Sequence, residues 1–116
     1  MPLPLIIVNP ASAGGATRRA WPGMASDVRS NFGPFKCAFT GARGDGRQLA
    51  REAAKAGHRL IIACGGDGTV SEVANGIIES GEPAELGVLP SGTEPSFARY
   101  ATMVGDLSAR TISAFS

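Results

Sequence analysis

Apolar residues follow two patterns along this chain: short continuous runs and longer stretches with helical spacing. The continuous runs predict strands at residues 3–8, 35–40, 59–64 and 85–89. The third and fourth contain Leu-Ile-Ile-Ala-Cys and Leu-Gly-Val-Leu, with no polar residue at alternate positions. Strands that are covered on both faces show this pattern, so we expect a sheet buried between layers of helices.

Two helices are predicted between the first three strands. The first has apolar residues at helical spacing up to Phe32, and Pro22 requires that it either start there or kink. The second covers residues 45–56, with Asp45 as its N-cap and Gly57 directly after its end.

The third predicted helix follows the third strand directly. Thr69 and Glu72 have the spacing of a capping box at its start. Its apolar stripe, which stops before Gly81, consists of Val70, Val73, Ala74, Ile77 and Ile78. Strands and helices therefore alternate, as in right-handed parallel crossovers. The predicted fold class is α/β: a Rossmann-like open parallel sheet with helices on both faces.

Length and composition limit the organisation and the functional classes. A chain of 116 residues is about one domain, so residues 1–116 are predicted as a single unit with a short terminal helix at 107–115, capped by Asp106. The net charge is +1 with both signs interspersed, which gives no basic face for nucleic acid. The N-terminus lacks the features of a signal peptide and no apolar run reaches the length of a membrane span, so we expect a cytoplasmic protein.

The two cysteines and the single histidine are not predicted to form a metal site. Cys37 and Cys64 each lie in an apolar run, where buried reduced thiols are favoured over a disulfide. No CxxC motif or Cys/His cluster is present, so no metal ligands are predicted among these residues. His58 follows a predicted helix end, where we expect a solvated loop residue rather than a catalytic base.

The strongest candidate for chemistry is the segment Gly65-Gly66-Asp67-Gly68-Thr69, between a buried strand and a helix. Ligands of open α/β sheets bind beyond the carboxyl ends of the strands. Glycines there let the backbone approach a phosphate, which the N–H groups and positive end of the next helix attract. Asp67 suits either Mg²⁺ held through water or deprotonation of an attacking hydroxyl. The alternative is a tight turn with Thr69 as a helix cap.

Four motifs follow one another over residues 5–99. They are Asn9-Pro10-Ala11-Ser12-Ala13-Gly14-Gly15; Thr40 with Gly44-Asp45-Gly46; Gly65-Gly66-Asp67-Gly68-Thr69-Val70 with Glu72-Val73-Ala74-Asn75-Gly76; and Gly87 to Pro90-Ser91-Gly92-Thr93 with Phe97-Ala98-Arg99. Together they resemble the diacylglycerol kinase catalytic domain shared with sphingosine kinases and bacterial YegS-like lipid kinases. NAD kinases share the Gly-Gly-Asp-Gly-Thr loop but lack the Pro-x-Gly-Thr element, and are the nearest alternative.

The resemblance implies ATP as phosphoryl donor, Mg²⁺, and a lipid alcohol at a membrane surface as acceptor. Asp67 would be the catalytic residue, acting on the metal or a proton, during in-line transfer that depends on positioning and charge neutralisation. The nucleotide would be held by Asn9, Pro10, Ser12, Thr40, Gly65, Gly66, Gly68, Thr69, Glu72, Gly92 and Thr93.

One stretch departs from the family pattern. The family has Gly-Thr-Gly-Asn-Asp-Phe-Ala where this chain has Gly-Thr-Glu-Pro-Ser-Phe-Ala at residues 92–98. Glu94 adds a negative charge near the expected phosphate, Pro95 removes an amide side chain and a backbone donor, and Ser96 replaces a carboxylate. Alternatively, Glu94 and Pro95 simply start a helix, since proline suits a first turn.

The resemblance implies a second, mostly β domain, and the given sequence ends about where that domain would begin. We therefore expect an ATP-binding lobe with little or no kinase activity alone: either another chain supplies the rest, or the protein is a fragment or a degenerate paralogue. Exposed apolar surface at the missing contact also predicts self-association. A non-catalytic nucleotide-sensing or oligomerisation module is the alternative, and an NAD kinase-like enzyme ranks third. Trp21 is expected in the core rather than stacked on adenine, whereas Arg18, Arg19 and Arg43 are left open between phosphate contact and a solvated surface.

Overall fold

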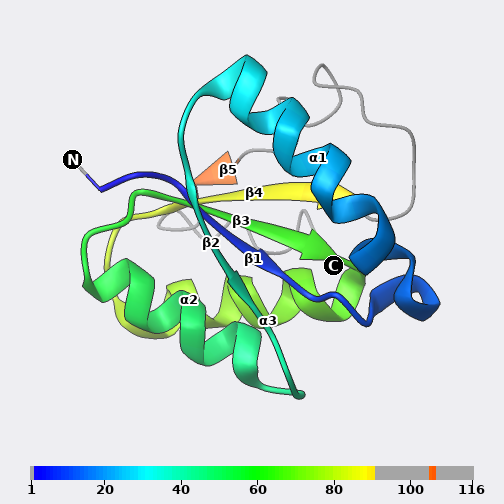
Figure 1. Ribbon diagram of the computed structural model, residues 1–116. Coiled ribbons are helices and arrows are strands. Elements are labelled where there is room, and N and C mark those ends of the chain that lie inside the picture. The colour runs from blue at the N-terminus through cyan, green and yellow to red at the C-terminus, as the bar shows by residue number, and fades with distance from the viewer. Residues whose placement is uncertain (1, 91–104, 107–116) are drawn as a thin grey trace.

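The computed structural model describes residues 2–90 and 105–106 (Figure 1). Each strand and helix predicted up to residue 90 is present, and the start of the first helix is the largest departure. The elements are β1 Leu5–Val8, a 3₁₀ turn Ser12–Gly15, α1 Ala16–Phe32, β2 Lys36–Phe39, α2 Asp45–Lys55, β3 Leu60–Gly65, α3 Asp67–Ser80, β4 Glu85–Pro90 and β5 Gly105–Asp106.

The strands form one sheet in the order β2-β1-β3-β4-β5. β1 pairs in parallel with both β2 and β3, and β3 pairs in parallel with β4. In Figure 1, α1 lies on one side of the sheet and α2 and α3 lie on the other. The predicted α/β sheet with helices on both faces is therefore confirmed. The short β5 departs from the all-parallel expectation, because it runs antiparallel to β4.

Several sequence predictions fall beyond Pro90. Asp106, the predicted cap of a terminal helix, lies in β5. The predicted helix at 107–115, the candidate nucleotide residues Gly92 and Thr93, and the unusual stretch 94–96 all lie outside the described residues.

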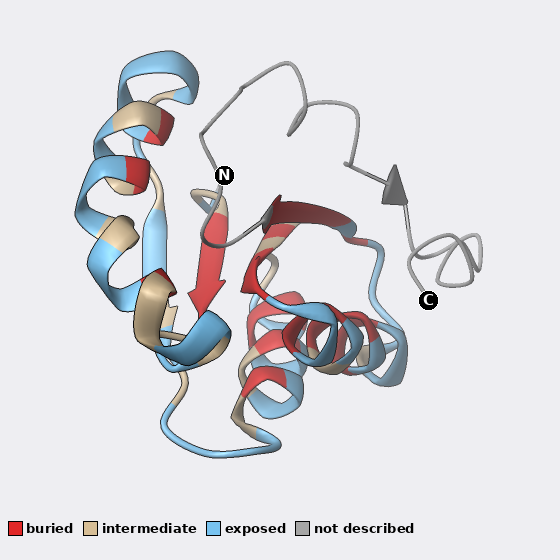
Figure 2. Cartoon of the chain, turned by 90° about the vertical axis from the view of Figure 1, so that its right-hand side faces the viewer, coloured by how far each residue is buried: buried red, intermediate tan, exposed pale blue. Residues whose placement is uncertain are grey.

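Side chains of the central strands alternate between two hydrophobic cores. Leu5 and Ile7 of β1 belong to the core shared with α2 and α3, whereas Ile6 and Val8 belong to the core under α1. This follows because successive side chains of a strand point to opposite faces. Figure 2 shows the buried residues of the helices on the sides that face the sheet. The continuous apolar runs thus reflect coverage on both faces, as predicted.

α1 begins at Ala16 and contains Pro22 in its interior, so of the two alternatives for this proline the helix start is excluded. Proline removes a backbone N–H and leaves a carbonyl of the preceding turn without its helical partner. Pro22 is exposed, so water can replace the missing donor. Met24 and Val28 are buried against the sheet and hold the helix in place. Packing of this face outweighs the local cost of the proline.

The two predicted N-caps do not form. Gly44 and Gly66 are the residues that precede α2 and α3, so Asp45 lies at the first position of its helix and Thr69 lies inside the first turn of α3. The Glu72 carboxylate accepts hydrogen bonds from the start of α2 and not from the first residues of its own helix. The capping-box interpretation is therefore wrong, because the tertiary contact offers Glu72 other donors.

Both cysteines are free thiols, but only Cys64 is buried. The expectation of a buried Cys37 is wrong because β2 is an edge strand, and all but one of its residues are exposed. Burial raises the pKa of the Cys64 thiol from 9.0 to about 12.

Trp21 of α1 packs against β2 and the residue before it. Its ring lies edge-on to Phe35 and Phe39, with centroid separations of 6.1 and 6.2 Å. These contacts agree with the packing role that the apolar stripe predicts for Trp21.

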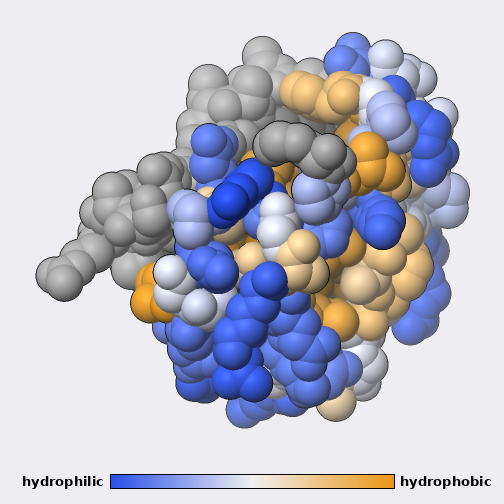
Figure 3. All heavy atoms as spheres, turned by 90° about the vertical axis from the view of Figure 1, so that its left-hand side faces the viewer, coloured by the Kyte–Doolittle hydropathy of each residue, from blue (hydrophilic) through white to orange (hydrophobic). Residues whose placement is uncertain are grey.

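Large apolar side chains also reach the surface. Phe32, Phe39 and Ile78 are 60%, 53% and 44% exposed, although the helical stripe placed Ile78 among the buried residues. Figure 3 shows hydrophobic residues among hydrophilic ones on the face at the left of Figure 1. Within the described part of the chain, no helix is both long enough and apolar enough to cross a membrane.

Candidate functional site

A pocket of about 410 Å³ opens at the carboxyl ends of β1, β2 and β3. β2, the next strand in the chain, lies on one side of β1, and the chain then crosses to place β3 on the other side. The strand order therefore reverses at β1. Crevices at such switch points are where open α/β sheets bind ligands. Its described lining comes from the three loops that follow these strands and from the start of α3, and consists of Asn9, Ala11, Ser12, Thr40, Gly41, Ala42, Arg43, Gly66, Gly68, Thr69 and Glu72.

Most of the residues singled out from the sequence are brought together here. The pocket lining contains Asn9, Ser12, Thr40, Gly66, Gly68, Thr69 and Glu72. Pro10, Gly65 and Asp67 are next to lining residues in the chain but are not part of the lining. Asp67 is exposed and begins α3, one residue after Gly66.

The glycines of the β3–α3 segment differ in what surrounds them. A Cβ atom at Gly65 would lie 2.5 Å from the Thr69 hydroxyl oxygen, so packing within the protein requires a glycine there. At Gly66 and Gly68 a Cβ atom would meet no atom of the described residues within 4 Å. Neither residue has a positive φ, so backbone conformation does not require glycine either. Packing and backbone geometry explain Gly65 but leave Gly66 and Gly68 facing open pocket space.

The β1 loop is joined to the β3–α3 segment through one side chain. The Asn9 amide nitrogen donates a hydrogen bond to the Thr69 hydroxyl at 3.2 Å, and its oxygen accepts the Ala11 N–H at 3.1 Å. Thr69 is 6% exposed, so this contact lies at the base of the pocket. Because the hydroxyl accepts from Asn9, its own proton is left to donate elsewhere.

The turn after Asn9 is held by two hydroxyls and contains a strained residue. The Ser12 hydroxyl donates to the Asn9 carbonyl at 2.9 Å and also bonds to the hydroxyl of the fully buried Thr17. Ala13 has a φ of 55°, a left-handed conformation that a side chain disfavours by roughly 1 kcal/mol. Ala13 is therefore a position where the local geometry and the residue type disagree.

The loop between β2 and α2 is held by two carboxylates. Asp45 Oδ2 accepts the N–H groups of Gly41 and Ala42, at 2.7 and 2.9 Å. Glu72 of α3 accepts the N–H of Gly44 on Oε2 and the N–H of Gly46 on Oε1, at 3.1 and 3.0 Å. The role of Glu72 in the structure is therefore to connect α3 to the start of α2.

Arg43 and Glu72 are the ionisable residues in the described lining. The sequence left Arg43 open between a phosphate contact and a solvated surface, and the structure places it at the pocket. The signal that favours it is its position directly after the β2 exit. Arg18 and Arg19 are exposed on α1 and are not part of this lining. His58 is half-buried, and its Nδ1 lies 2.6 Å from the Leu3 carbonyl oxygen, before β1 begins.

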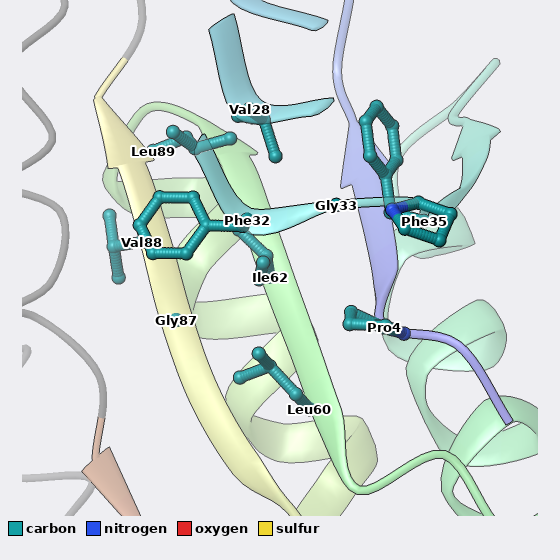
Figure 4. Close-up of a pocket in the computed structure, with 11 residues that line it drawn as sticks. Pro4, Val28, Phe32, Gly33, Phe35, Leu60, Ile62, Gly87, Val88 and Leu89 are labelled. Carbon is teal, nitrogen blue, oxygen red and sulfur yellow. The ribbon is translucent and has the colours of Figure 1, made fainter. Parts of the chain in front are cut away.

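A second, smaller pocket of about 90 Å³ lies on the α1 side of the sheet (Figure 4). It is formed by the end of α1, the segment after it, and parts of β3 and β4. Figure 4 shows Val28 and Phe32 facing Ile62, Val88 and Leu89 across it. Its described lining has no ionisable side chain, so it offers no group to bind phosphate or to transfer a proton.

The open α/β sheet, with a pocket at its switch point, places this chain in the α/β class. The particular family follows from comparison: the diacylglycerol kinase catalytic domain matches residues 4–115, and the chain belongs to this family. The resemblance predicted from the four motifs is thereby confirmed.

Named relatives agree with this assignment. A diacylglycerol kinase from Staphylococcus haemolyticus is 34% identical over 102 residues, which cover 88% of this chain and 31% of that protein. A YegS-like lipid kinase from Pseudomonas syringae pv. tomato is 39% identical over 83 residues, covering 72% and 27%. This chain spans about a third of the length of these relatives.

Solved structures show the same relationship. The crystal structure of a diacylglycerol kinase from Bacillus anthracis str. Sterne has a TM-score of 0.67 and 31% identity, over 84% of this chain and 35% of that one. A phosphate-loop protein solved in solution has a TM-score of 0.59 at 18% identity, over 88% and 87% of the two chains, and is similar in fold alone.

Proposed function

We propose that the switch-point pocket binds the phosphates of ATP together with Mg²⁺, and that the chain is the nucleotide-binding lobe of a lipid kinase. The observation that carries this proposal is the open space at Gly66 and Gly68, which neither the packing of the described residues nor the backbone conformation explains. A ligand that approaches the backbone closely would explain it. Membership of the diacylglycerol kinase family supports ATP as the donor.

In this proposal the start of α3 binds phosphate oxygens. Gly66 and Gly68 present backbone without side chains, and the amino end of α3 contributes its positive dipole. The Thr69 hydroxyl, which accepts a bond from Asn9, retains a proton to donate to the ligand. Thr40 and Ser12 form the sides of the same pocket.

Asp67 is proposed to act on the metal or on a proton. Mg²⁺ keeps several waters and is usually bound by one or two carboxylates together with substrate phosphates, so a single exposed carboxylate next to the phosphate loop fits it. The described residues contain no group of three His, Cys, Asp or Glu side chains that would hold a metal without the nucleotide. With Mg²⁺ neutralising phosphate charge, Asp67 would orient its water ligands or accept the proton of the attacking hydroxyl.

The proposed acceptor is a lipid hydroxyl at a membrane surface, reached from the cytoplasm. Such a transfer depends on the alignment of donor and acceptor and on charge neutralisation. This lobe would supply the donor side. A second domain or another copy would supply the acceptor side, so we expect weak activity or none from this chain alone.

A calorimetric titration with ATP, with and without Mg²⁺, tests the binding proposal. Gly68→Ala should raise the Kd for MgATP about tenfold or more, because a methyl group would occupy the space of a phosphate contact. Gly23→Ala is the matched control, since Gly23 also lies in a helix with nothing within 4 Å of its Cβ position and is remote from the pocket lining. Asp67→Ala should remove most of the Mg²⁺ dependence. No saturable binding in a folded sample would show that the proposal is wrong.

Transfer is a separate measurement, with labelled ATP and diacylglycerol vesicles. A protein that binds MgATP but transfers no phosphate to the lipid is consistent both with an incomplete kinase lobe and with a non-catalytic module. Restoring the family residues (Glu94→Gly, Pro95→Asn, Ser96→Asp) and adding a β domain in trans should yield activity from a lobe and none from a module. Phosphorylation of NAD in place of lipid would instead favour an NAD kinase-like enzyme.

A further inference from the structure

One wall of the switch-point pocket is the β2–α2 loop, residues 40–44. Thr40, Gly41, Ala42 and Arg43 of this loop all belong to the pocket lining. The facing wall is the start of α3, which the proposed function assigns to phosphate. The distance between these walls determines which ligand the pocket accepts, so the contacts that set it bear on binding.

The β2–α2 loop has little burial to hold it in place. Gly41, Ala42, Arg43 and Gly44 are all exposed, and Gly44 has a φ of 94°. A loop without buried apolar contacts depends on its hydrogen bonds for a defined position. The bonds from Asp45 come from the first residue of α2, so they shape the loop without tying it to the rest of the pocket.

Glu72 supplies the connection across the pocket. Its two carboxylate oxygens accept the N–H groups of Gly44 and Gly46, one at each side of the start of α2. A carboxylate suits this place, because it offers two acceptors and its charge is favoured at the amino end of a helix. The fit is close, since a Cβ atom at Gly46 would lie 2.9 Å from Glu72 Oε1. Glu72 itself lies on α3, one turn after the phosphate loop.

We infer that Glu72 is a positioning residue that fixes the β2–α2 loop against α3 and thereby holds Arg43 in the pocket wall that faces the proposed phosphate site at the start of α3. This inference rests on the proposed function for its ligand. Among the described residues Arg43 has no ion-pair partner, whereas the charge of Glu72 is compensated by two N–H donors. The pocket therefore presents one uncompensated positive charge to an anion, at a place that Glu72 sets. Arg43 is the group that contacts the nucleotide, and Glu72 acts through it.

Two variants with matched controls test the inference. Glu72→Gln keeps the size of the side chain but replaces one acceptor with an NH₂ group that faces an N–H donor. Its control is Glu79→Gln, two turns further along α3, where the carboxylate pairs with Arg47 at the surface. Arg43→Ala removes the proposed contact, and Arg47→Ala is its control. Gly46→Ala perturbs the same hydrogen bonds at the donor residue, because the added methyl group would collide with the Glu72 side chain.

The first readout needs no nucleotide. Loss of one charge-assisted bond should speed amide hydrogen exchange at Gly44 and Gly46 about tenfold in Glu72→Gln, and leave it unchanged in Glu79→Gln. Unchanged exchange at these two amides would overturn the inference. Hydrogen exchange tests the inference even if the wild-type protein binds no nucleotide. Absence of nucleotide binding would count against the proposed function and not against the role of Glu72 in fixing the loop.

The second readout is the Kd for MgATP, measured well below the melting temperature of each variant. Arg43→Ala should raise it about tenfold, and Glu72→Gln and Gly46→Ala about fivefold. The double variant Glu72→Gln/Arg43→Ala should bind no worse than Arg43→Ala, because Glu72 acts through Arg43. A merely structural Glu72 would lower the melting temperature and leave the Kd unchanged. That result, or independent effects that multiply in the double variant, would overturn the inference.

Discussion

The contact between α2 and α3 and the loop that starts α3 are both rich in glycine, but for opposite reasons. At Gly76, in the helix contact, a Cβ atom would lie 2.2 Å from the Arg47 carbonyl oxygen and 2.9 Å from the Cβ of Ala50. At Gly66 and Gly68, in the loop, it would meet nothing within 4 Å. The first glycine is required by atoms of the protein, and the other two face space that the described part of the chain leaves open. This difference separates residues that build the fold from residues proposed to serve a ligand.

The largest effect should follow from filling the helix contact. Gly76→Ala should lower the free energy of unfolding by about 3 kcal/mol, because a rigid backbone carbonyl must move to admit the methyl group. Urea unfolding followed by circular dichroism measures this change. Gly23→Ala serves as the control, and a loss below about 0.5 kcal/mol at Gly76 would mean that the two helices separate easily.

Neighbouring glycines of the loop should differ in the same way. Gly65→Ala should cost about 2 kcal/mol, because its methyl group would collide with Thr69. Gly66→Ala should change stability by no more than about 0.5 kcal/mol while weakening MgATP binding. Thermal unfolding and titration of both variants separate the two quantities. Equal losses of stability would erase the distinction drawn between the two kinds of glycine.

The burial of Cys64, the residue before this loop, can be tested by the pH dependence of stability. Cys64 has a pKa of about 12 in the folded protein against 9.0 for an ordinary thiol. Below pH 9 the thiol is protonated in both states, so it contributes no pH dependence. Above pH 9 the unfolded chain loses the proton first, and stability should fall by up to about 1.4 kcal/mol per pH unit until the folded pKa is reached. Cys64→Ala should lack this component when unfolding is compared between pH 8 and pH 10. Equal slopes for the two proteins would contradict the burial of the thiol.

The smallest effect should come from the opposite change, a glycine introduced where the backbone favours one. Ala13→Gly should raise stability by about 0.5 kcal/mol, because relief of the positive φ exceeds the added entropy of the unfolded chain. Differential scanning calorimetry is sensitive enough for this shift. Ala11→Gly provides the comparison, since Ala11 has a φ of −82° and should lose stability on the same change.

Local patterns predicted most of the elements but not their connections. The continuous run of β3 implies coverage on both faces whatever the partner, because every side chain is apolar. The pairing of Glu72 with Thr69 in a capping box failed, since a spacing of three residues does not reveal that α2 brings two free N–H groups within reach. The sequence left the start of α1 open for a similar reason. Its stability past Pro22 comes from buried contacts with the sheet, which no local rule contains.

Periodicity and residue order were enough to predict the α/β class, the family, and a glycine-rich loop after a buried strand. They also predicted most residues of the candidate pocket, since loops at the carboxyl ends of parallel strands must share one edge. Three features became known from the folded arrangement: Cys37 is exposed on an edge strand, Arg43 lies at the pocket, and Glu72 bonds to α2. These three depend on which elements are neighbours, and neighbours far apart in the chain are chosen by packing of the whole sheet and its helices.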